Sequence, residues 1–197
     1  MTYEAILPLV LFALVSSITP GPNNLMLLAS GANFGFRRSV PHMLGISMGF
    51  ALMALLVGIG LAQVFELYPV LKLILKILAM VYMLYLAWKI ANAAAPKSVS
   101  ATAKPFTFLQ AAAFQWVNPK AWAMALTAVT VYAPNQQFAV IAIVAGVFSV
   151  VNLPSVTFWA VMGQQMQKVL TNQRRLQVFN ITMAMLLVGS LYSVLFV

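Results

Sequence analysis

Two short polar motifs interrupt apolar segments of this 197-residue chain, and both contain residue types that can bind a charged small molecule. The first motif is Pro20-Gly21-Pro22-Asn23-Asn24, and the second is Gln115-Trp116-Val117-Asn118-Pro119-Lys120. A proline has no backbone N–H to donate within a helix, and its ring clashes with the carbonyl group four residues earlier. We therefore expect both segments to be broken helices with free backbone groups.

The free groups at such breaks would suit a zwitterion. The prolines release the backbone carbonyls of Ser16, Ile18 and Gln115. These carbonyls could accept hydrogen bonds from an ammonium group. A new helix is expected to begin near Pro22 and another near Asn118, each with free N–H groups and about half a positive charge at its start. Together with Lys120, these two helix ends would bind a carboxylate.

The two breaks are expected at the same depth in a membrane. Pro22 lies nine residues before Gly31, and Pro119 lies eleven residues after Phe108, both of which we place near the same membrane face. At about 1.5 Å per residue, each break is about 15 Å deep. The hydrocarbon layer is about 30 Å thick, so both breaks fall near its midplane. This match predicts one shared site, although the alternative of simple proline kinks stays open.

The predicted site consists of the two motifs and a few polar neighbours. The predicted substrate-binding residues are Ser16, Thr19, Pro20, Gly21, Pro22, Asn23, Asn24, Gln115, Asn118, Pro119, Lys120 and Asn152. The candidates for proton coupling are Lys120 and His42, the only histidine. Each has a structural alternative, since Lys120 could extend toward the membrane surface and His42 could be an interfacial residue.

The composition predicts an all-α integral membrane protein. Hydrophobic residues make up 63% of the chain and charged residues only 7%, against about 25% charged residues in soluble domains. Several apolar runs exceed the roughly 20 residues that span a bilayer, and they lack the alternating pattern of barrel strands. The predicted transmembrane helices cover residues 5–31, 41–63, 68–91, 108–132, 138–163 and 178–197.

The basic residues predict how these six helices are oriented. Arginine and lysine occur in alternate connections, which are those around residues 32–40, 89–107 and 164–177. The positive-inside rule places these connections in the cytoplasm, so both termini are predicted to be periplasmic. Topology thus accounts for the net charge of +9 without nucleic acid. Lys72 and Lys76 do not fit this pattern, and they either reach the outer headgroups or line an exit path.

A polar stretch rich in small residues divides the chain into two halves. We predict a first three-helix repeat at residues 1–92, a cytoplasmic linker at 93–107 and a second three-helix repeat at 108–197. With three spans each, the halves cross the membrane in opposite directions, as in a 3+3 inverted repeat. Transporters of this type bind substrate near the midplane at broken helices, which here are helices one and four.

Several motifs resemble those of the lysine exporter (LysE/RhtB) family. They are TPGPNN at 19–24, GFRRS at 35–39, GISMGF at 45–50, LAWKIA at 86–91 and FQWVNPK at 114–120. The resemblance implies a six-span secondary exporter of amino acids in the bacterial inner membrane, coupled to protons. It also implies that the signature positions are Pro20, Gly21, Pro22, Asn118, Pro119 and Lys120. Within the family, the combination looks most like the cysteine/O-acetylserine exporters.

One departure from the family bears on the substrate. Relatives nearer the lysine exporters carry an acidic residue after the second glycine of the GISMG motif, where this chain has Phe50. No span interior holds a carboxylate, so a second substrate cation would be buried without a counter-ion, which is costly. We therefore expect export of small neutral amino acids or derivatives by alternating access. The expected partners are the zwitterionic substrate, the lipid bilayer and protons, with no cofactor.

Other function classes stay open at this point. The same site could serve a passive channel or an importer, because the sequence does not fix the direction of transport. An enzyme is disfavoured, since one histidine, no cysteine and no carboxylate within a span leave little acid–base or metal chemistry. A non-transporting membrane subunit would not need matched helix breaks. The oligomeric state is also open, with a homodimer as one alternative.

Overall fold

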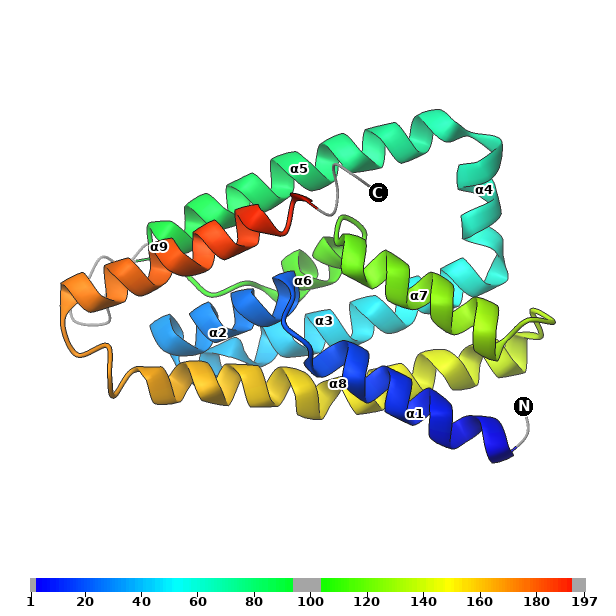
Figure 1. The fold of residues 1–197 in the computed structure, drawn as a ribbon, viewed down its shortest axis with the longest axis horizontal. Coiled ribbons are helices and arrows are strands. Elements are labelled where there is room, and N and C mark those ends of the chain that lie inside the picture. The colour runs from blue at the N-terminus through cyan, green and yellow to red at the C-terminus, as the bar shows by residue number, and fades with distance from the viewer. Residues whose placement is uncertain (1–2, 94–103, 193–197) are drawn as a thin grey trace.

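The computed structural model describes residues 3–93 and 104–192, and every regular element in these ranges is a helix (Figure 1). The predicted all-helical class is confirmed for this part of the chain. Most of the predicted linker at 93–107 lies outside the described residues. The elements are α1 (Tyr3–Ile18), α2 (Pro22–Phe34), α3 (Phe36–Leu56), the π-helix η1 (Val57–Leu61), α4 (Ala62–Leu67), α5 (Pro69–Ala91), α6 (Phe108–Gln115), α7 (Pro119–Tyr132), α8 (Phe138–Met166) and α9 (Gln173–Gly189).

Three helical stretches are long and apolar enough to cross a membrane, although the first of them is kinked at Gly60. They are Phe36–Leu67, Pro69–Ala91 and Phe138–Met166. The bent pair of α1 and α2 makes a fourth if it is counted as one broken span. The other two predicted spans fall on shorter helices. The span predicted at 108–132 is divided into α6 with 8 residues and α7 with 14, and the span predicted at 178–197 overlaps α9, which has 17 residues. The structure therefore supports three or four membrane spans by length and composition.

Helix α8 organises the packing of the bundle. It packs against α1, α2 and α3, while α3 also packs against α6 and α7. Helix α5 packs chiefly against α9, and Figure 1 shows these two helices side by side along the edge opposite α8. Asn33 on α2 and Asn180 on α9 are both buried and exchange side-chain hydrogen bonds of 2.7 and 3.0 Å. This amide pair holds α9 to the helix that follows the first break.

Glycines let the site-bearing helices approach their neighbours at backbone contact. A Cβ atom at Gly31 of α2 would overlap the Ala160 carbonyl oxygen of α8, and a Cβ atom at Gly163 would overlap the Leu28 carbonyl oxygen. On the other side, a Cβ atom at Gly49 of α3 would lie 2.6 Å from a backbone atom of α6. Because only glycine permits these distances, α2 and α6 pack at backbone contact against α8 and α3.

The start of the second predicted span differs from the structure. It was predicted at residue 41, but α3 begins at Phe36 and is joined to α2 by Gly35 alone. The φ angle of Gly35 is 80°, a conformation that favours glycine and lets the chain reverse within one residue. Arg37 and Arg38 therefore lie in the first turn of a helix instead of a loop. Helix α5, by contrast, begins at Pro69, within one residue of the predicted start at residue 68.

Candidate functional site

The first helix break lies where the Pro-Gly-Pro motif predicts it. Helix α1 ends at Ile18, α2 begins at Pro22, and the two helices are bent by 56°. Asn24 closes the break, since its Nδ2 donates to the carbonyl oxygens of Ser17 at 2.9 Å and of Thr19 at 2.7 Å. These bonds satisfy carbonyl groups that the unwound turn leaves without helical partners.

The second break follows the predicted asparagine–proline chemistry. Helix α6 ends at Gln115 and α7 begins at Pro119, where the missing backbone N–H costs no helical hydrogen bond. Asn118 caps α7, because its side-chain oxygen accepts a hydrogen bond from the backbone N–H of Lys120 at 3.1 Å. The Asn118 side chain is buried, so this cap also satisfies a polar group that has no access to water.

Two sets of hydrogen bonds join the breaks to each other. The amides of Asn23 and Gln115 bond reciprocally at 2.9 and 3.1 Å. Lys120 Nζ donates to the Thr19 carbonyl oxygen at 2.6 Å and to the Thr19 hydroxyl oxygen at 2.8 Å. The fold thus brings together two motifs that lie far apart in the sequence, as expected for one shared site.

A small cavity lies between the two breaks. Its volume is about 30 Å³, which leaves room for a few water molecules at most, because one water needs roughly 10–15 Å³. The lining residues are Ser16, Ser17, Gly21, Asn23, Asn24, Phe50, Gln115, Asn118, Lys120, Ala121, Met124 and Asn152. Most of the predicted binding residues therefore surround one space.

Four predicted residues lie beside this central cavity without lining it. Thr19 and Pro20 are exposed residues of the first break, and Thr19 holds Lys120 through the two bonds described above. Pro22 and Pro119 are the first residues of α2 and α7. Their contribution is to begin the two helices at the cavity.

Sequence reasoning missed some lining residues. Ser17 is a polar neighbour of the first motif, so its position in an apolar segment was an available signal. Its buried hydroxyl has no hydrogen-bond partner among the described residues. Phe50 and Met124 reach the cavity from α3 and α7 through tertiary packing, and no local pattern marks them. Asn152 lines the cavity as predicted, from within the continuous helix α8.

The backbone carbonyls predicted to remain free are occupied within the protein. The Ile18 carbonyl oxygen accepts a hydrogen bond from the indole Nε1 of Trp159 at 3.0 Å. The Ser16 carbonyl accepts from the Thr19 hydroxyl at 3.0 Å, and that of Gln115 accepts from the next turn. The prediction of open carbonyls was wrong because it considered only helical partners and could not include a side chain from α8.

His42 lies apart from this site, and the prediction of an interfacial position was wrong. Its side chain is fully buried and packs against Phe106, with 5.0 Å between ring centroids. Neither imidazole nitrogen has a hydrogen-bond partner within the described ranges. The error follows from the early start of α3 at Phe36, which places His42 in the second turn of the helix instead of at its beginning.

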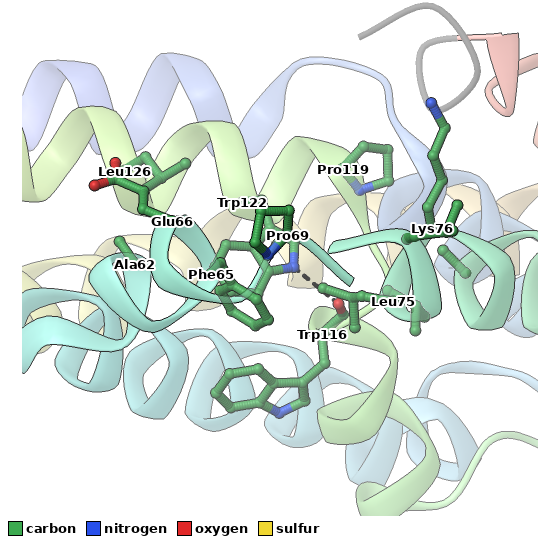
Figure 2. A pocket seen from close by; sticks show the side chains of 13 residues that line it. Ala62, Phe65, Glu66, Pro69, Leu75, Lys76, Trp116, Pro119, Trp122 and Leu126 are labelled. Atoms are coloured by element: carbon green, nitrogen blue, oxygen red, sulfur yellow. Dashed lines mark hydrogen bonds between the residues drawn. The ribbon is translucent and has the colours of Figure 1, made fainter. Parts of the chain in front are cut away.

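Two larger cavities border the helices that leave the breaks. One has a volume of about 320 Å³ and lies along α2, and its lining includes Met26, Ser30, Asn33, Lys89 and Phe106. The other has a volume of about 570 Å³ and lies along α4, α5 and α7, and Figure 2 shows the residues that line it. Lys76 is among the lining residues. The side chain of Lys72 lies outside the described residues.

Known proteins similar to this chain are translocators. The family described as LysE type translocator matches residues 14–191. The cysteine/O-acetylserine efflux protein of Escherichia coli (strain K12) is 34% identical over 184 residues, with 90% of each chain covered. The protein of that name from Shigella sonnei (strain Ss046) has the same identity and coverage. That of Escherichia coli O139:H28 is 33% identical, also over 90% of each chain. No solved structure matches the chain significantly.

Proposed function

Because this chain belongs to the LysE type translocator family, we propose that it exports small neutral amino acids or their derivatives from the cytoplasm. Family membership makes it an amino-acid export transporter in the membrane and not an enzyme. The relatives that carry the name cysteine/O-acetylserine efflux protein favour substrates of that size and charge. The observation that carries the proposal is the meeting of two helix starts and Lys120 at one cavity.

The substrate carboxylate is proposed to bind Lys120 and the helix starts. The N-termini of α2 and α7 both adjoin the central cavity, and each favours an anion. Lys120 Nζ gives two short bonds to Thr19, whereas its third contact, to the Pro20 carbonyl oxygen, is 3.5 Å long. That distance exceeds the usual range for N–H···O bonds. One ammonium proton is therefore weakly bound and available to a carboxylate.

The rest of the substrate is proposed to contact groups around the same cavity. The buried Ser17 hydroxyl lacks a partner among the described residues, and a substrate ammonium group would satisfy it. Phe50 and Met124 provide apolar surface for a small side chain. The cavity lining includes no carboxylate, and the chain has only Glu4 and Glu66. A second positive charge on the substrate would therefore have no counter-ion there.

Alternating access is proposed because the central cavity is too small for an amino acid. The larger cavities lie along α2 and along α7, which leave the two breaks in different directions (Figure 1). Helix α1 packs on α8 as α6 packs on α3, and α5 packs on α9. This pairing is the one expected if six spans form two inverted three-helix repeats, at residues 1–92 and 108–197, joined by a cytoplasmic linker. We propose this arrangement, in the bacterial inner membrane and with periplasmic termini.

Proton coupling is proposed to act through Lys120. This residue contacts both breaks, and loss of its positive charge would weaken its bonds to Thr19 and to the substrate carboxylate together. His42 is the second candidate, because it is buried and lacks hydrogen-bond partners among the described residues. A Lys120→Ala variant that retains full export driven by a pH gradient would remove the first role.

Export should be measured with the purified protein in proteoliposomes. Labelled neutral and basic amino acids are loaded on one side, and transport is followed with and without a proton gradient. We expect counterflow of neutral amino acids, stimulation by the gradient and little transport of lysine. A passive channel would show no stimulation by unlabelled substrate on the opposite side, and an importer would show the reverse gradient dependence. Absence of transport for the whole panel would refute the proposed function.

A further inference from the structure

We propose that the cavity of about 570 Å³ is a second binding site for the exported amino acid, reached after the central cavity. In this site, Glu66 binds the ammonium group, and the aromatic side chains of Phe65, Trp116 and Trp122 pack against the remainder of the substrate. The inference rests on the proposed function and adds an exit site with its own ligand contacts.

A single stretch of chain separates the two cavities. Within residues 115–122, the side facing the central cavity consists of Gln115, Asn118, Lys120 and Ala121. The other residues of this stretch, which are Trp116, Val117, Pro119 and Trp122, line the large cavity instead. No residue of this stretch lines both. The wall is therefore one chain thick, and it contains the second helix break, where the regular helical hydrogen bonds are interrupted.

The aromatic residues form a connected wall of the large cavity. Trp122 Nε1 donates to the Trp116 carbonyl oxygen at 2.8 Å, a bond that spans the break (Figure 2). The Trp116 and Trp122 rings are 6.2 Å apart, and Phe65 of α4 meets Trp122 edge-on at 5.2 Å. A substrate packed against Trp122 would thus contact the side chain that forms the hydrogen bond across the second helix break. Occupation of the exit site would in this way affect the break.

The charged residues favour a zwitterion over a lipid tail in this cavity. Glu66 and Lys76 both line it, and Glu66 is one of only two acidic residues in the chain. In Figure 2, the Glu66 carboxylate lies near Leu126, whereas Lys76 lies on the side of Pro119. A carboxylate at the border of an apolar cavity is a suitable partner for an ammonium group. An acyl chain would bring no group to pair with the Glu66 carboxylate.

Single cysteines can test whether the cavity binds substrate, because the natural chain contains none. Ala62→Cys and Leu126→Cys place a thiol on the cavity lining from α4 and α7. We expect both to react with a membrane-impermeant thiol reagent added from the periplasmic side, and millimolar serine, which has no thiol, to slow the reaction several-fold. Val64→Cys is the matched control, because Val64 is 39% exposed and lies on α4 without lining the cavity, so serine should not slow its reaction.

A second substitution tests the role of the carboxylate. Adding Glu66→Gln to Ala62→Cys should abolish protection by serine while leaving the unprotected labelling rate within twofold. Glu66→Asp should restore part of the protection. Elution as a single species in detergent shows that each variant is folded. Protection by serine at either of the two cysteine positions is sufficient to support the exit site.

Three outcomes would overturn the exit site. The first is no labelling at either position, which is expected if an acyl chain fills the cavity. The second is labelling from the cytoplasmic side only. The third is labelling from the periplasmic side that serine does not slow. If the unmodified protein shows counterflow while any of these results is obtained, only the second site is refuted. Absence of counterflow in the unmodified protein would instead refute the proposed function.

Discussion

Replacing Lys120 with methionine is expected to raise the half-saturation concentration for substrate about tenfold. Lys120 Nζ already donates to the Thr19 carbonyl and hydroxyl oxygens at 2.6 and 2.8 Å, so a bound carboxylate gains one further bond. A hydrogen bond to a charged group contributes about 1.5–3 kcal/mol. Because the side chain is only partly buried, we take the lower end. About 1.4 kcal/mol corresponds to a factor of ten.

Counterflow of labelled serine in proteoliposomes measures this effect directly. Lys168→Met is the matched control, since Lys168 is an exposed lysine in the turn after α8 and should leave the half-saturation concentration within twofold. Lys120→Arg retains the positive charge on a side chain of different shape. Its half-saturation concentration should fall between those of the unmodified protein and Lys120→Met. A Lys120→Met protein with the half-saturation concentration of the unmodified chain would refute a carboxylate contact at Lys120.

The remaining predictions concern stability and can be checked by thermal unfolding in detergent. Gly163→Ala should lower the unfolding temperature, because its Cβ would overlap a backbone carbonyl of α2 at a cost of about 1–3 kcal/mol; Gly146→Ala, which has open space, should not lower it. Asn118→Ala removes the cap of α7 and should cost about 1 kcal/mol, whereas an unchanged unfolding temperature would exclude a stabilising cap. Asn33→Ala and Asn180→Ala should each destabilise by about 1–3 kcal/mol, and the double variant by clearly less than their sum; additive effects would show that the pair is not coupled.

The sequence was informative where backbone chemistry is local. Both helix breaks could be predicted, because a proline cannot continue a helix and an asparagine before a proline caps the next one. The match in depth predicted that the breaks would meet. Most of the central cavity lining followed from these two motifs, including Asn152, which was marked by its polar side chain in an apolar segment.

The missed features depend on contacts between distant parts of the chain. The indole of Trp159 occupies a carbonyl at the first break, and no pattern around Ile18 indicates it. The burial of His42 follows from the position of Phe106, which lies at the far end of the predicted linker. The boundary at Gly35 was missed because two arginines suggested a polar loop, although they fit the exposed first turn of α3.

The one-residue joint at Gly35 has a mechanical consequence for transport. The adjoining ends of α2 and α3 must move together, because a single residue joins them. Helix α2 begins at the first break, while α3 contributes Phe50 to the central cavity and continues through η1 into α4. A displacement of the C-terminal end of α2 would therefore also move the start of α3, the helix that supplies Phe50 to the central cavity.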